Sequence, residues 1–168
     1  MSESLVVFSH GKESGPWGTK ITRLAEAARA RGFEVMSPDY SATHDPRRRV
    51  EQLLALAPQA RRLVLAGSSM GGYVAAQACA QLRPQGLFLM APALYFDGWN
   101  EEPQGTPALS VVVHGWRDDI VPVDRALRFA RPRQAALHLL DSGHTLNDRL
   151  PELSALFDRL LGDVLALP

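Results

Sequence analysis

Short apolar runs that alternate with amphipathic segments constrain the fold of this chain more than any other feature. The runs are LVVF (5–8), FEVM (33–36), LVLA (63–66), LFLM (87–90), SVVVH (110–114) and ALHLL (136–140). Most are apolar at nearly every position, which is typical of strands buried on both faces of a parallel sheet. We therefore expect an α/β fold, a three-layer sandwich with about six parallel strands and helices on both faces.

The segments between these runs have the periodicity of amphipathic helices. An apolar stripe at i, i+3, i+4 and i+7 predicts the first helix, and it consists of Ile21, Leu24, Ala25 and Ala28. Asp45 is expected to cap the second helix, with Pro46 at its first position. A third helix is expected from about Met70 to Leu82, a fourth with Asp124 as its cap, and a last one from near Pro151.

The bulk composition predicts a soluble protein without a pronounced charge. The 168 residues fit one compact domain spanning 1–168. Eighteen basic and eighteen acidic residues cancel, which argues against a nucleic-acid or membrane partner. The densest basic cluster, Arg47 to Arg49, is typical of a solvated helix face. The first residues have no basic region and only a short apolar run, so we expect no signal peptide and a cytoplasmic location.

Cys79 is the only cysteine, and it lies among alanines. A single cysteine excludes an intramolecular disulfide and a cysteine metal cluster. Its apolar surroundings indicate a small buried side chain rather than a reactive thiol.

The sequence GSSMG (67–71) lies between an expected strand and an expected helix. G-x-S-x-G in this setting is the pattern of a nucleophile elbow, where serine occupies a strained turn with small residues two positions away. Ser69 meets this condition, whereas Ser68 would be flanked by Ala66 and the bulky Met70. The alternative is a glycine-rich turn that packs closely or cradles a phosphate, although no P-loop lysine is present. Ser69 is therefore the candidate nucleophile.

A serine nucleophile needs a base and a group that orients the base. In a parallel sheet the loops after the strands meet at one edge, so the partners are expected in HGWRDDIVP (114–122) and DSGHTL (141–146). Their order along the chain is Ser, Asp, His, one of the orders known for this triad. His144 follows a glycine and is the best candidate for the base, whereas His10 and His114 are expected to shape turns.

The segments SHGK, GSSMGG, HGWRDDIVP and DSGHTL, in this order, resemble the α/β-hydrolase superfamily, in particular its small, lidless bacterial esterase-like members. The resemblance covers almost the whole chain. It implies Ser69 as the nucleophile and His144 as the general base and acid. It also implies Asp118, the fifth residue of H-G-x-x-D-x-x-V-P, as the triad acid, with Asp119 as its rival.

The same resemblance implies an oxyanion hole formed by two backbone N–H groups, those of Met70 and Lys12. Without the other motifs, the segment HGKESG around Lys12 would be an ordinary glycine turn. Residues 91–109 are too few for a helical cap domain, so we expect a minimal fold with an open site. Five aromatic residues could line an apolar acyl pocket, or belong to the core or an interface: Trp116, Tyr95, Trp17, Phe96 and Trp99.

Together these features imply a serine hydrolase that cleaves carboxylic esters of small or acyl substrates through an acyl-enzyme. The mechanism needs no metal or cofactor, and the expected partner is a small-molecule ester or acyl compound. Thioesterase and amidase or peptidase activity on the same triad remain alternatives, because the leaving group is selected by pocket shape. A catalytically inactive hydrolase fold that only binds is the alternative from another class.

Overall fold

The central sheet has six strands in the order β2-β1-β3-β4-β5-β6, and every neighbouring pair is parallel. The computed structural model describes residues 1–168. The strands are β1 (Ser2–Ser9), β2 (Glu34–Met36), β3 (Ala60–Ser68), β4 (Gly86–Met90), β5 (Leu109–Gly115) and β6 (Ala136–Leu140). Each of the expected apolar runs coincides with one of these strands, except that Phe33 precedes β2, and the parallel sheet is confirmed.

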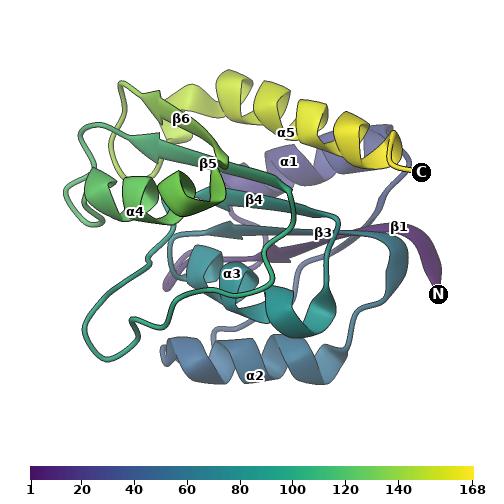
Figure 1. Ribbon diagram of the computed structural model, residues 1–168, viewed down its shortest axis with the longest axis horizontal. Coiled ribbons are helices and arrows are strands. Elements are labelled where there is room, and N and C mark those ends of the chain that lie inside the picture. The colour runs from purple at the N-terminus through teal and green to yellow at the C-terminus, as the bar shows by residue number, and fades with distance from the viewer.

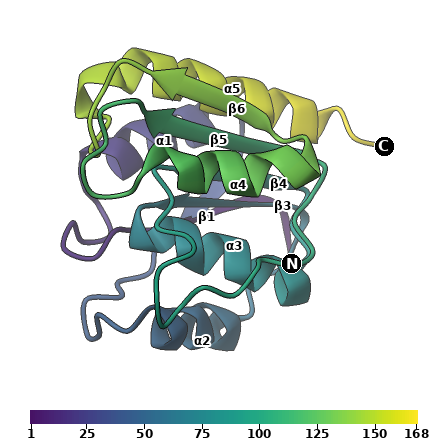
Figure 2. The same ribbon diagram turned by 60° about the vertical axis from the view of Figure 1, so that its left-hand side comes forward.

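Helices cover both faces of this sheet. They are α1 (Thr19–Ala30), α2 (Pro46–Leu56), α3 (Met70–Leu82), α4 (Val123–Arg133) and α5 (Leu150–Leu165), with a short 3₁₀ turn η1 (Asn147–Arg149) before α5. Helices α1 and α5 lie on one face, and α2, α3 and α4 lie on the other (Figures 1 and 2). The predicted three-layer sandwich is confirmed.

Alternation along each strand separates two buried cores. Successive strand side chains point to opposite faces, so Val6 and Phe8 of β1 face α1 and α5, whereas Leu5 and Val7 face α2 and α3. On the α5 side, the Phe157 ring centroid lies 5.9 Å from that of Phe8 and 5.1 Å from that of Phe88. This aromatic cluster joins α5 to the middle of the sheet.

The observed N-terminal cap agrees with the predicted one in α2 and differs from it in α4. Asp45 caps α2 as predicted, because its carboxylate accepts a hydrogen bond from the Arg47 N–H at 3.0 Å. The predicted cap at Asp124 is wrong. Helix α4 begins at Val123, and Pro122, with its extended backbone, occupies the capping position. Asp124 therefore lies in the first turn, where its charge can only interact with the helix dipole.

The connection between β4 and β5 contains no helix and thus no cap domain, as expected from its length. The strands point the same way, so the loops after them gather at one edge of the sheet, on the left of Figure 1. None of the helices combines the length and apolar character that crossing a membrane requires.

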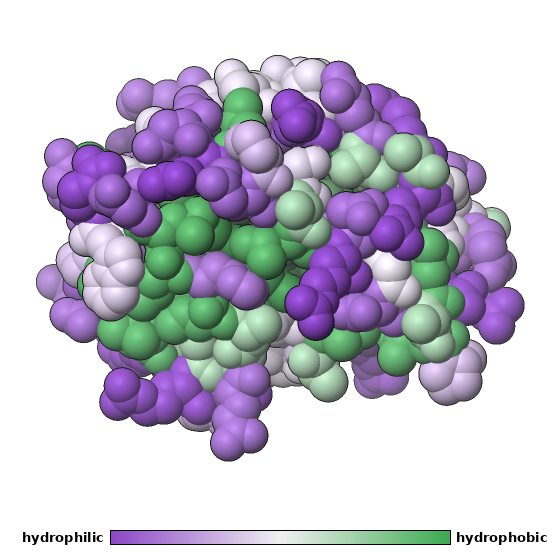
Figure 3. Space-filling model, turned by 90° about the horizontal axis from the view of Figure 1, so that it is seen from above, coloured by the Kyte–Doolittle hydropathy of each residue, from purple (hydrophilic) through white to green (hydrophobic).

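Strand β6 forms one edge of the sheet, and its leucines Leu137, Leu139 and Leu140 are only half-buried. Figure 3 shows the face on which α5 and β6 lie uppermost, and apolar side chains form a patch where β6 is found. The apolar sequence of β6 therefore reaches the surface, unlike that of the central strands.

The aromatic cluster under α5 gives a test of the packing. Phe157 is fully buried, whereas Leu56 at the end of α2 is 48% exposed. We expect Phe157→Ala to lower the free energy of unfolding by about 3–5 kcal/mol, since it removes buried area and leaves a cavity. Leu56→Ala is the matched control and should change it by about 0.5 kcal/mol at most. Urea denaturation measures both, and equal effects would contradict the assignment of this core.

Candidate active site

A sharp kink joins β3 to α3 at Ser69. The residue has φ 53° and ψ −117°, a backbone conformation that residues other than glycine rarely adopt. Two hydrogen bonds hold the kink: the Ser69 N–H donates to the Met90 carbonyl at 2.9 Å, and the Ser69 carbonyl accepts from the Ala93 N–H at 2.9 Å. The end of β4 and the loop after it therefore fix the strained turn.

Gly67 and Gly71, on either side of the kink, lie where the backbone leaves no space for a Cβ atom. A Cβ atom on Gly67 would lie 2.1 Å from the Gly71 carbonyl oxygen, and one on Gly71 would lie 1.8 Å from the Ser9 carbonyl oxygen. Neither position can hold a side chain, because the obstructing atoms belong to the backbone. The turn thus packs directly against the end of β1, as a nucleophile elbow requires.

Three predicted side chains meet at the sheet edge. His144, after β6, places its Nε2 3.0 Å from the Ser69 Oγ and its Nδ1 2.7 Å from the Asp118 Oδ2. Asp118 follows β5, so three separate loops contribute one group each. Because a carboxylate only accepts, the neutral imidazole carries its proton on Nδ1. Its Nε2 is then free to accept the proton of the Ser69 hydroxyl.

Asp118 is held by the backbone of its own turn. Its side chain is fully buried, and its Oδ1 accepts hydrogen bonds from the N–H groups of Ile120 at 2.9 Å and Val121 at 2.8 Å. The rival, Asp119, is exposed, and no hydrogen bond joins it to His144. The geometry therefore supports Asp118 as the group that orients the imidazole.

His114 does more than shape a turn. It is fully buried on β5, with its Nε2 2.8 Å from the Val121 carbonyl oxygen and 3.3 Å from the Asp118 Oδ2. Burial is the main cause that lowers the pKa of His114, so the ring is neutral and its Nε2–H donates. His114 thereby contacts the same carboxylate oxygen of Asp118 that His144 contacts.

The loop after β1 lies beside the nucleophile. A Cβ atom built on Gly11 would lie 3.7 Å from the Ser69 Cβ, which is ordinary contact distance. The backbone N–H of Lys12 donates no hydrogen bond within the protein, and Met70 is the first residue of α3, where an N–H has no acceptor in its own helix. Both residues line the pocket that contains the Ser69 side chain. Lys12 and Met70, the residues that the resemblance implies for the oxyanion hole, therefore line the same pocket as Ser69.

The pocket over Ser69 has a volume of about 740 Å³. Its apolar lining residues are Met70, Ala93, Phe96, Trp99, Ile120 and Val121. Lys20 and Thr145 also line it: the Lys20 ammonium donates to the Thr145 carbonyl at 2.6 Å, and burial lowers the pKa of this lysine. No group of three or more His, Cys, Asp or Glu side chains is arranged to hold a metal ion. The pocket thus combines apolar and polar lining residues around Ser69.

Comparison with known proteins agrees with this geometry. Residues 6–167 match the family model described as the alpha/beta hydrolase family. This protein belongs to the alpha/beta hydrolase family. A proposed hydrolase of the α/β superfamily from Xanthomonas campestris pv. campestris is 35% identical, with a TM-score of 0.86 over 97% of this chain and 99% of the other.

Two more distant structures share the fold of this alpha/beta hydrolase. A serine hydrolase without lid from Xanthomonas campestris is 23% identical, with a TM-score of 0.71 over 100% of this chain and 85% of the other. An esterase from Pyrococcus furiosus is 17% identical, with a TM-score of 0.76 over 96% of this chain and 82% of the other. No curated protein sequence gives a significant match.

The expected aromatic pocket needs a correction. Trp116 is 58% exposed and Trp17 is 50% exposed, and neither contributes to the pocket of this alpha/beta hydrolase. Tyr95 is buried, and its hydroxyl donates to Glu102 at 2.5 Å, which turns the ring away from the pocket. Phe96 and Trp99 are the aromatic residues that line it. The direction of a loop side chain depends on tertiary contacts, and the neighbouring sequence does not specify these.

The arginine run also departs from expectation. Arg47 and Arg48 are exposed, but Arg49 is fully buried, so the expected solvated face is wrong for this residue. The signal was present in the helix spacing, because Arg49 lies three residues after buried Pro46 and four before buried Leu53. Sequence reasoning thus missed a charged residue that faces the protein interior.

The steric argument for the elbow predicts the effect of a single methyl group. Gly71→Ala should lower the free energy of unfolding by about 3 kcal/mol or more, because the clash with the Ser9 carbonyl requires backbone movement. Gly143→Ala is the matched control, since no atom lies within 4 Å of a Cβ at that position. Thermal and urea denaturation compare the two variants. A Gly71→Ala protein as stable as the control would refute the close packing of turn and strand.

Proposed function

We propose that this alpha/beta hydrolase is a serine hydrolase that cleaves carboxylic esters through an acyl-enzyme intermediate. The observation that carries the proposal is the continuous chain of contacts from the Ser69 Oγ to His144 Nε2, at 3.0 Å, and from His144 Nδ1 to Asp118, at 2.7 Å. A binding module has no use for a hydroxyl, an imidazole and a buried carboxylate in this order, whereas acyl transfer needs all three.

In the first step, His144 Nε2 takes the proton of the Ser69 hydroxyl as the oxygen attacks the ester carbonyl carbon. The carbonyl π electrons move onto oxygen, and the resulting oxyanion accepts hydrogen bonds from the N–H groups of Lys12 and Met70. Met70 is the first residue of α3, so the helix dipole adds to this stabilisation. Collapse of the intermediate breaks the ester C–O bond, and His144 returns the proton to the leaving alcohol.

Water completes the cycle by the same steps in the second half. His144 deprotonates it, the hydroxide attacks the acyl carbon, and the Ser69 oxygen leaves with the proton. Asp118 keeps the imidazole in one tautomer and stabilises the imidazolium that forms twice in each turnover. The bonds from its Oδ1 to two backbone N–H groups hold the carboxylate for this role.

The pocket supports an ester with an apolar acyl or alcohol group. Phe96, Trp99 and Ile120 offer apolar surface beside Ser69, and no cap domain covers the opening. The description of the Pyrococcus furiosus structure as an esterase is consistent with this choice. Thioesters and amides would react by the same steps, so a panel of p-nitrophenyl esters, acyl-coenzyme A compounds and aminoacyl amides ranks the three classes.

Covalent labelling tests the nucleophile. A fluorophosphonate probe should modify the wild-type protein at Ser69 and leave Ser69→Ala unmodified, as peptide mass spectrometry after labelling will show. Ester turnover by Ser69→Ala should fall by orders of magnitude, up to about 10⁶ for loss of a triad nucleophile, while its circular dichroism spectrum stays unchanged. Ser68→Ala is the control and should label normally. Equal turnover by Ser69→Ala and wild type would exclude the proposal.

Two adjacent carboxylates test the orienting group. Asp118→Asn should reduce kcat by about 10⁴, because the amide favours the wrong imidazole tautomer. Asp119→Asn should leave kcat near the wild-type value, since this side chain is exposed and has no contact with His144. Steady-state kinetics on one p-nitrophenyl ester compares them. A larger loss in Asp119→Asn would reverse the assignment of the acid.

A further inference from the structure

Arg49 of α2 is a fully buried cation whose guanidinium reaches the loop after β1. We propose that Arg49 is a positioning residue for catalysis: together with His10 it orients the peptide between Gly11 and Lys12 so that the Lys12 N–H faces the substrate oxyanion. This inference rests on the proposed function, because the Lys12 N–H has this role only in acyl transfer.

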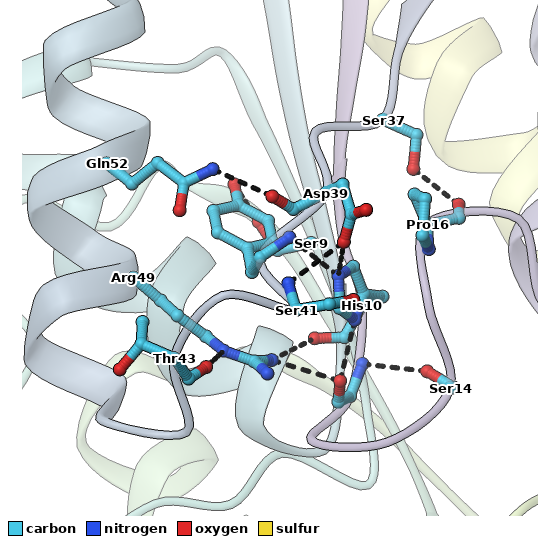
Figure 4. A network of polar contacts seen from close by, with 12 residues as sticks. Ser9, His10, Ser14, Pro16, Ser37, Asp39, Ser41, Thr43, Arg49 and Gln52 are labelled. Carbon is cyan, nitrogen blue, oxygen red and sulfur yellow. Dashed lines mark hydrogen bonds and ion pairs between the residues drawn. The ribbon is translucent and has the colours of Figure 1, made fainter.

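The donors of Arg49 all end on backbone carbonyls. Its Nη1 donates to the Gly11 oxygen at 3.0 Å and to the His10 oxygen at 3.4 Å. Its Nη2 donates to the Lys12 oxygen at 3.1 Å and its Nε to the Thr43 oxygen at 2.8 Å. Figure 4 shows the guanidinium pointing from its helix to the loop that carries Ser14. No carboxylate lies within ion-pair distance of it. The guanidinium therefore binds only the loop after β1 and Thr43, which lies in the segment before α2.

The geometry of the peptide unit connects Arg49 to the oxyanion. The Gly11 carbonyl and the Lys12 N–H belong to one planar trans peptide, so they point in opposite directions. With the carbonyl bound to Arg49, the N–H is directed away from the guanidinium. It has no acceptor within the protein, and Lys12 lines the pocket over Ser69. Fixing one end of this peptide therefore fixes the donor at its other end.

His10 supplies a second donor to the same carbonyl. Its Nδ1 lies 2.7 Å from the Gly11 oxygen, and its Nε2 accepts the Tyr40 N–H at 2.9 Å. The second contact requires a bare Nε2, so the neutral ring carries its proton on Nδ1. Ser14 closes the loop, since its Oγ accepts the Gly11 N–H at 3.1 Å. Figure 4 shows His10 and Arg49 converging from two sides of the loop.

The planar fork of arginine suits this task better than the single ammonium of lysine. A guanidinium has five N–H donors in fixed directions, and here three different nitrogens bind the carbonyls of four residues. Lysine would keep the charge but could not hold the Gly11 and Lys12 carbonyls in this fixed geometry. A residue that merely filled space or joined α2 to the sheet would have no effect on the reaction rate of folded protein.

Kinetics on Arg49→Lys and Arg49→Ala tests the proposal. We expect kcat on a p-nitrophenyl ester to fall about tenfold to hundredfold, part of the 10²–10³ that follows complete loss of an oxyanion donor. KM should change little, because the donor acts mainly in the transition state. Millimolar guanidinium ion should restore part of kcat in Arg49→Ala and none in Arg49→Lys. Arg48→Ala is the control, since its side chain is 74% exposed on the same helix.

A pair of inhibitors separates oxyanion stabilisation from general loosening of the site. An alkyl trifluoromethyl ketone adds to Ser69 and carries an oxyanion, whereas the methyl ketone of the same chain binds as an uncharged ground-state analogue. Arg49→Lys should lower the affinity for the trifluoromethyl ketone by the same factor by which it lowers kcat/KM. Its affinity for the methyl ketone should stay at the wild-type value.

Several results would overturn the proposal. Wild-type kcat in a folded Arg49→Lys protein, or equal losses of affinity for both ketones, would make Arg49 a structural link only. Loss of the fold in both variants would also overturn it, because Arg49 would then be needed for folding of the whole domain rather than for positioning one loop. A wild-type protein that neither turns over esters nor reacts with the fluorophosphonate would instead refute the proposed function, and the inference with it.

Discussion

The contact between the turn after β3 and the end of β1 is the constraint on which the rest of the structure depends. Ser9 pairs with Gly67 in the sheet, and a Cβ on Gly71 would lie 1.8 Å from the Ser9 carbonyl oxygen. Neighbouring parallel strands end at the same level, so the kink at Ser69 lies beside the loop that follows β1. The nucleophile and both backbone donors of the candidate oxyanion hole come from these two segments. The packing that permits the fold also assembles the site.

The remaining groups depend on the same edge of the sheet. Strand β5 lies beside β4 and β6 lies beside β5, and the loops after β5 and β6 bring Asp118 and His144 to the serine that follows β3. Strand β4 contributes no side chain to this set, but its Met90 carbonyl accepts the Ser69 N–H and holds the strained residue. A shift of one residue in the register of any of these strands would turn its side chains to the other face. The relative positions of the site residues therefore depend on the register of the sheet.

Patterns that depend on local sequence could be predicted, and those that depend on tertiary contacts could not. The apolar runs predict the strands because burial on both faces leaves no polar positions, and G-x-S-x-G predicts Ser69 because only glycine fits beside the kink. The choice between Asp118 and Asp119 rests on resemblance, since the turn that selects one of them uses backbone N–H groups, which all residues except proline have. The direction of Tyr95 depends on Glu102, which no local pattern links to it.

Arg49 shows the same limit for a charged residue. Its partners are carbonyl oxygens, which are identical in every residue, so no complementary acid in the sequence marks it as buried. Removing a cation from water is unfavourable unless dipoles replace the lost hydration, and the loop carbonyls supply them here. A carboxylate partner would have occupied these donors, and the Gly11 and Lys12 carbonyls would have lost their hydrogen bonds to Arg49. Because carbonyls accept all the hydrogen bonds of Arg49, the loop peptides direct their negative ends to the guanidinium, and their N–H ends are thereby turned away from it.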